Sequence, residues 1–137
     1  MKTYIQAQMK YLICAWIFIS GPAVSRAAEM YWTDEARDAY TLVSALRVDE
    51  GLTLIRLHAI THPDNLIWPY LEDYAEFIRI FTQEDMRKMP AFLEASTRRL
   101  ERIASVPESN PLSLMAQGQI LLHQCALHLQ QGQFFAA

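Results

Sequence analysis

The chain has 137 residues, of which 52 % are hydrophobic and 20 % are charged. It is therefore long enough for one small domain with a packed core, and too hydrophobic for an intrinsically disordered segment. Its formal net charge is −3, and an acidic balance without a basic stripe argues against a nucleic-acid partner and against anionic membrane surfaces.

The N-terminus has the pattern of a secretory signal peptide. Lys10 is followed by YLICAWIFISGPAV, an apolar run of about 14 residues, and then by the small residues of SRAAE. We expect cleavage after Ala27 or two residues earlier, which makes 1–27 the signal peptide and 28–137 the mature domain. The alternative is a retained membrane anchor, but the run is shorter than the about 20 residues of a span and a Gly-Pro pair interrupts it. The sequence thus predicts an exported protein that touches the membrane only through an uncleaved signal segment.

Cleavage would also change the charge and the cysteine content. Residues 1–27 contain three basic side chains, no acidic side chain, and Cys14, so the mature chain has a net charge of −6 and one cysteine, Cys125. A lone cysteine cannot form an internal disulfide. Within LLHQCALHL, Cys125 is typical of a small core residue, with a reactive thiol as the alternative.

From residue 28 onward, apolar residues recur at spacings of three and four, and no segment alternates as a strand does. We therefore predict an all-α fold of about five antiparallel helices joined by short turns. The expected helices cover residues 34–47, 49–60, 66–81, 90–105 and 111–131. In the first two helices the apolar positions that we expect in the core include Leu46, Leu57 and Ile60.

Local signals mark the ends of these helices. Thr33 is a candidate N-cap, and the second helix must end before Pro63, because a residue before proline is pushed out of the helical region. Asn110, directly before a proline, is a strong start signal. Gly132 supplies the left-handed cap that ends the last helix.

The segment before the fourth helix is interrupted by Pro90. Thr82 followed by Asp85 has the pattern of a capping box, which predicts that a new helix starts there. Because an interior proline bends or breaks a helix, we expect one turn at 83–88, a kink, and then a regular helix.

The last stretch, LLHQCALHLQQGQFFAA, resembles the tetratricopeptide repeat, a helical hairpin with small residues where its two helices approach and a glycine at the turn. The same frame fits the opening hairpin, residues 33–63, while the middle unit is longer than the usual repeat. The residues at repeat-motif positions are Ala39, Val48, Gly51, Pro63, Cys125, Gly132, Phe134 and Ala137.

The chain is also similar to the N-terminal part of uncharacterised exported helical-repeat proteins of Gram-negative bacteria, in HPDNLIWPYLEDY, RRLERI and NPL. The resemblance implies a solenoid segment of stacked helical hairpins, located in the periplasm or at the outer cell surface. It also implies a role in protein–protein interaction or scaffolding, without catalysis and without a cofactor.

In the repeat frame, Phe134 and Ala137 begin a second helix and the chain then stops. The fifth helix would lack its partner, which leaves apolar residues such as Leu129 uncovered, and exposed apolar patches mark interfaces. We therefore expect the domain to be truncated at its C-terminus, with a protein or peptide partner, or the remainder of a longer repeat array, on this face.

Aromatic residues gather on the third expected helix, where Tyr70, Tyr74, Phe77 and Phe81 share one face. Core packing is the favoured interpretation. Trp68 lies on another side of this helix and is a candidate for the edge of a groove that receives peptide segments. The possible partner-binding residues are Trp68, Tyr70, Leu114, Leu121 and Leu122.

Two histidines, His58 and His62, are the candidates for a metal site, because residues four apart share one helix face. However, HAITH lacks the glutamate of a metalloprotease signature and no third ligand is identifiable. The alternative function is a helical domain that binds a small ligand or a metal, or an enzyme, using His58, His62 and Trp68.

No catalytic residue is expected. The carboxylates Glu72, Asp73 and Glu76 follow one another along the third expected helix, and we expect them on its solvated face rather than across a cleft as glycosidase chemistry requires. No serine lies in a nucleophile-elbow motif, and no glycine-rich loop could hold a phosphate.

Overall fold

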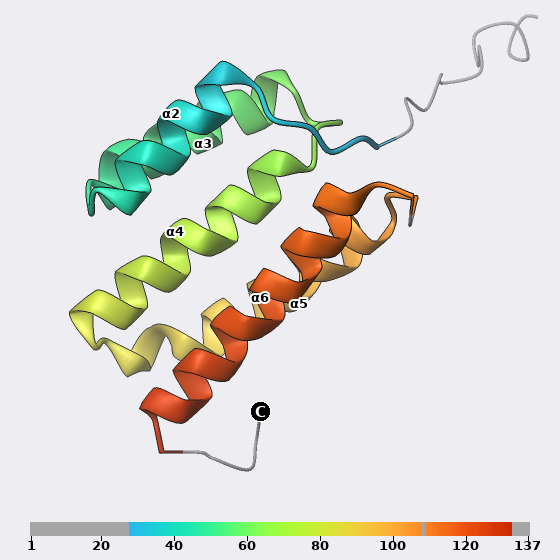
Figure 1. Ribbon diagram of the computed structural model, residues 1–137. Coiled ribbons are helices and arrows are strands. Elements are labelled where there is room, and N and C mark those ends of the chain that lie inside the picture. The colour runs from blue at the N-terminus through green and yellow to red at the C-terminus, as the bar shows by residue number, and fades with distance from the viewer. Residues whose placement is uncertain (1–27, 108, 133–137) are drawn as a thin grey trace, which may run out of the picture.

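The computed structural model describes residues 28–107 and 109–132 (Figure 1). Within these ranges the chain forms five α-helices and one 3-10 turn, and no strand occurs there; an isolated β-bridge joins Glu29 and Asn65. The all-α prediction is confirmed. The helices are α2 (Asp34–Ser44), α3 (Val48–Thr61), α4 (Ile67–Gln83), α5 (Met89–Ala104) and α6 (Pro111–Gln130), with the 3-10 turn η1 at Met86–Lys88.

Helix α4 is the centre of the fold, because it contacts all four other helices. Figure 1 shows α2, α4 and α6 as one layer, with α3 behind α2 and α5 behind α6. Consecutive helices pack against each other, and α4 also contacts α2 and α6 within its own layer. One consequence is that α4 has no fully solvated side.

The helix ends follow the local signals in the sequence. The Thr33 hydroxyl accepts a hydrogen bond from the Ala36 amide at 3.1 Å, and the Asn110 side chain accepts from the amides of Leu112 and Ser113. Gly132 has a φ of 77° after the last turn of α6. These three predicted caps are confirmed, since each satisfies backbone groups that a helix end leaves unpaired.

The predicted capping box is wrong. Helix α4 continues through Thr82, whose hydroxyl donates to the Ile78 carbonyl at 2.7 Å instead of capping a new helix. The helix ends where Glu84 takes a left-handed conformation, with a φ of 53°. After η1, Pro90 lies in the first turn of α5, where a missing amide hydrogen costs little, so no kink is needed within α5.

Helices α2 and α3 approach closely at Gly51. A Cβ atom there would lie 2.5 Å from Val43 Cγ2 and 3.3 Å from the Ala39 carbonyl oxygen. Ala39 and Val43 are fully buried on the facing side of α2. The absence of a side chain at residue 51 therefore sets how closely these two helices can pack.

Three residues predicted for the core, Leu46, Leu57 and Ile60, are exposed instead. The first helix ends at Ser44, and Leu46 lies in the turn with a φ of 62°. In α3 the buried positions are Gly51, Leu52 and Ile55. The second half of α3 therefore has apolar residues on both its packed and its solvent sides.

Candidate functional site

Helix α6 has two apolar faces. One face packs into the fold through Ala116, Ile120 and Leu127, together with the buried polar residues Ser113 and His123. The opposite face carries large apolar side chains that are between 41 % and 67 % exposed. We call this set the outer stripe; it consists of Leu114, Met115, Leu121, Leu122 and Leu129.

The outer stripe is continuous along the helix. Leu114, Leu121 and Leu129 follow the spacing of residues that lie above one another on one helix face. Gly118 and Cys125 fall between them, and a Cβ atom added at Gly118 would meet nothing within 4 Å. The stripe therefore has a low centre flanked by leucines, a shape that allows another helix to approach closely.

The composition of α6 makes this exposure unusual. None of its 20 residues is Asp, Glu, Lys or Arg, whereas a surface helix normally carries charged residues on its solvent face. An uncharged helix with apolar residues on a second face is more typical of a buried helix than of a surface helix. The exposed stripe on α6 is therefore a candidate interface.

Beside the stripe, a hollow of about 460 Å³ lies between α2, α4 and α6. Met115 of the outer stripe is at its edge, and the Tyr70 hydroxyl at its base donates a hydrogen bond to Gln119 Oε1. The remaining lining residues are Trp32, Arg37, Tyr40 and Thr41. The hollow extends the apolar surface of α6 toward α2.

Aromatic rings form a chain of contacts along the same layer. The rings of Tyr40 and Tyr74 stack with centroids 5.3 Å apart, and the His123 ring stacks on Phe77 at 4.4 Å. The Tyr74 ring also contacts the His123 ring, so the two pairs form one series. Trp32 contacts Tyr40 at one end of this series, and Phe81 contacts Phe77 at the other end. These ring contacts link α2, α4 and α6 within one layer.

A buried polar pair holds α6 against α4. The Asp73 carboxylate is fully buried, and its Oδ2 lies 2.8 Å from His123 Nδ1. Arg99 of α5 joins from the other side, with Nη2 2.9 Å from Glu76 and 3.3 Å from Glu72, and Nη1 3.8 Å from Asp73 Oδ1. Three helices are therefore tied together by charged and hydrogen-bonding groups beneath the surface.

The prediction that these carboxylates lie on a solvated face is wrong for Asp73, and Glu72 and Glu76 are partly buried. The physical reason is that α4 is surrounded by four helices. Sequence reasoning does not predict the contact between His123 and a carboxylate. The signal that could have indicated its burial is spacing, because His123 is three residues after Ile120 and four before Leu127, on the buried side of α6.

The predicted partner-binding residues divide into two groups. Trp68 and Tyr70 are buried, whereas Leu114, Leu121 and Leu122 are exposed on the outer stripe. Burial raises the pKa of the Tyr70 phenol from 10.0 to about 12, and the charges of Tyr40, Tyr74 and Asp73 add to this effect.

The candidate metal ligands are engaged in ring stacking. The His58 ring stacks on Trp68 with centroids 5.1 Å apart, and the His62 ring is parallel to that of His58 at 6.2 Å. Among the residues that the structure describes, no three His, Cys, Asp or Glu side chains are arranged to hold a metal ion.

Of the repeat-motif positions, Ala39 and Gly51 are buried, and Val48 and Cys125 are partly buried. Pro63 is exposed beyond the end of α3. Phe134 and Ala137 lie outside the described residues, as does the whole predicted signal peptide.

Comparisons with known proteins gave no match, neither to a protein-family model, nor to a curated protein, nor to a solved structure. None of the helices within the described ranges is long and apolar enough to cross a membrane.

Proposed function

We propose that this chain is an exported helical-repeat module that binds a protein partner through the outer stripe of α6, with no catalytic step. The observation that carries the proposal is the second apolar face of α6, on a helix without a charged side chain. Covering five large apolar side chains is favourable, because burial of apolar surface contributes roughly 25 cal/mol per Å².

The partner surface that fits this stripe is an amphipathic helix. From Leu114 to Leu129 the stripe runs along 15 residue steps of one helix, about 22 Å at 1.5 Å per residue. Rows of side chains at these spacings pack into the grooves of a second helix. The helix belongs either to a separate protein or to the next hairpin of a longer repeat array.

Two features of the fold support a tetratricopeptide-like arrangement. The small residues Ala39 and Gly51 lie where α2 and α3 approach most closely, as in the hairpin that the repeat describes. Helices α2, α4 and α6 share one layer and α3 and α5 the other. In such a stack the next unit would cover α6, which agrees with the position of the outer stripe. Export rests on the signal-peptide pattern of residues 1–27.

Site-specific photo-crosslinking in the producing cells tests the proposal. The photoreactive residue p-benzoylphenylalanine replaces Leu122, which is 67 % exposed, in one variant and Leu57 of α3, which is 58 % exposed, in the other. We expect an adduct from position 122 that mass spectrometry maps to an apolar helix face. The same adducts from both positions, or none from position 122, would contradict the proposal.

A further inference from the structure

We propose that the outer stripe of α6 binds a second copy of this chain, with the two α6 helices antiparallel. This inference rests on the proposed function and names the partner of the same surface. Identical chains most often assemble as dimers around a two-fold axis, in which one surface packs against itself. That surface must then be complementary to itself in its spacing, its charge and its extent, and the outer stripe meets all three requirements.

The spacing of the stripe is symmetric along α6. Leu114 lies as many residues before the midpoint of the stripe as Leu129 lies after it, and the same is true of Gly118 and Cys125. A two-fold axis through this midpoint, perpendicular to α6, therefore brings the leucine at one end level with the leucine at the other end of the second copy. It also brings Gly118 level with Cys125 of the second copy.

The small residues of the stripe lie where the two helices would approach most closely. At about 3.6 residues per turn, Gly118 and Cys125 fall near the centre line of the stripe, and the larger side chains form its two edges. A Cβ atom at Gly118 would meet nothing within 4 Å, so this centre line is open to another helix. The midpoint falls between Leu121 and Leu122, and Leu122 is 67 % exposed. In the dimer the two Leu122 side chains therefore pack against each other beside the axis.

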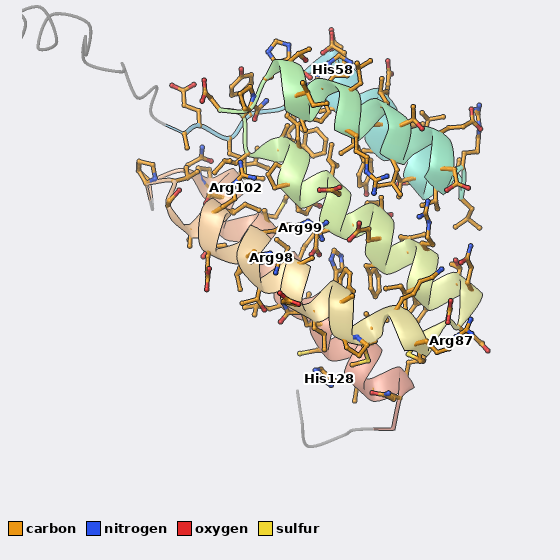
Figure 2. The ribbon with its side chains drawn as sticks, turned by 180° about the vertical axis from the view of Figure 1, so that it is seen from behind. His58, Arg87, Arg98, Arg99, Arg102 and His128 are labelled. Atoms are coloured by element: carbon orange, nitrogen blue, oxygen red, sulfur yellow. The ribbon has the colours of Figure 1, made fainter. Side chains whose placement is uncertain are left out.

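Charge is the second requirement, because a two-fold axis places identical groups of the two copies near each other. A charged residue beside the axis would face its own like charge. The neighbouring helix α5 has five charged residues among its 16, and Figure 2 shows Arg98, Arg99 and Arg102 along it. Helix α6 has no charged residue among its 20, so two copies of α6 meet without such repulsion.

The extent of the stripe is that of a small dimer interface. Its five large side chains are between 41 % and 67 % exposed. At about 200 Å² for a fully exposed leucine or methionine, this is roughly 500 Å² in each copy and about 1,000 Å² in a dimer, the size at which specific interfaces begin. The surface of Gly118 and Cys125 between these side chains adds to that area.

Sedimentation equilibrium of the protein purified from the producing cells measures the association. We expect a reversible dimer whose dissociation constant rises by about 100-fold or more in Leu122→Glu, because the carboxylate enters the interface twice. Leu57→Glu is the matched control, because Leu57 is 58 % exposed on α3, outside the stripe, and should associate as the unmodified chain does. Circular dichroism should show the same helix content in both variants. A chain that stays monomeric, or an equal loss in both variants, would overturn the proposal.

The direction of the two helices is tested with disulfides between chains that each keep one thiol. The sequence has two cysteines, Cys14 and Cys125. One chain carries Cys14→Ser, and the other carries Cys14→Ser, Cys125→Ser and Gly118→Cys. In the antiparallel pair residue 118 faces Cys125 of the second copy at a Cα separation that a disulfide spans, whereas two Cys125 residues lie about 10 Å apart along the helices. We expect a disulfide-linked dimer from the mixture and almost none from either chain alone. Equal linkage within each chain alone would mean parallel helices and would overturn the proposal.

The photo-crosslink from position 122 separates this inference from the proposed function. An adduct of twice the mass of the chain, linked through α6, supports both. An adduct with a different protein, from a chain that is monomeric after purification, overturns this inference and leaves the proposed function standing. A monomeric chain that gives no adduct overturns both.

Discussion

The buried pair of Asp73 and His123 should be the most sensitive point of the fold. In the variant His123→Leu the new side chain has nearly the volume of imidazole, so packing against Phe77 is largely kept. The Asp73 carboxylate, however, loses its hydrogen bond at 2.8 Å and keeps Arg99 Nη1 only at 3.8 Å. Leaving a buried carboxylate without its partner costs about 3–5 kcal/mol.

That loss is large against the about 5–15 kcal/mol by which a domain of this kind is stable. In urea unfolding followed by circular dichroism, with a slope of about 1.5 kcal/mol per molar urea, the midpoint should fall by about 2 M or more. The double variant Asp73→Leu/His123→Leu removes both partners and should regain most of the stability, because two apolar groups leave no orphaned charge. Arg99 then keeps Glu72 and Glu76 as partners.

Two outcomes would refute this reasoning. A loss below about 1 kcal/mol in His123→Leu would mean that the pair contributes little to the free energy of unfolding. A double variant as unstable as the sum of the two single variants would mean that Asp73 and His123 are not coupled.

Two further predictions concern other parts of the fold. Gly51→Ala should lower the free energy of unfolding by about 1–3 kcal/mol, since its Cβ would lie 2.5 Å from Val43 Cγ2; Gly118→Ala, with nothing within 4 Å, should raise it by up to about 1 kcal/mol through helix propensity. Equal effects in thermal unfolding would show that α2 and α3 do not pack as closely as described. The raised pKa of Tyr70 means that folding favours the neutral phenol. The contribution of this phenol to the free energy of unfolding is therefore complete below pH 10 and is lost as the pH rises through about 12. An absorbance titration at alkaline pH should contain a late phenol step that Tyr70→Phe removes, and an unchanged titration in that variant would contradict the assignment.

Much of the secondary structure could be predicted because its signals are local. The caps at Thr33 and Asn110 act on amides within three residues, and apolar spacing gives the helices within a few residues of their observed ends. Thr82 shows the limit of such local signals. Its hydroxyl can donate to the Ile78 carbonyl inside a helix or accept from an amide at the start of a new helix, and residue spacing alone cannot decide between the two.

The partners across the fold could not be predicted in this way. Asp73 and His123 are 50 residues apart, and nothing near either residue in the sequence indicates the other. In the same way, the apolar residues Leu57 and Ile60 do not reveal whether their side of α3 faces the core, because periodicity identifies a face and not what covers it. Which helices surround α4 is a tertiary property, and it determines why Asp73 is buried.

The most direct test of the account is the affinity of the crosslinked partner for two purified variants, Leu122→Glu and Leu57→Glu, measured by calorimetry. The account predicts that Leu122→Glu weakens binding by about 30-fold or more, equivalent to about 2 kcal/mol at a central interface position. Leu57→Glu should bind as the unmodified chain does, and both variants should unfold at the same urea concentration. Equal affinity of the two variants would contradict the claim that the outer stripe of α6 is the binding surface.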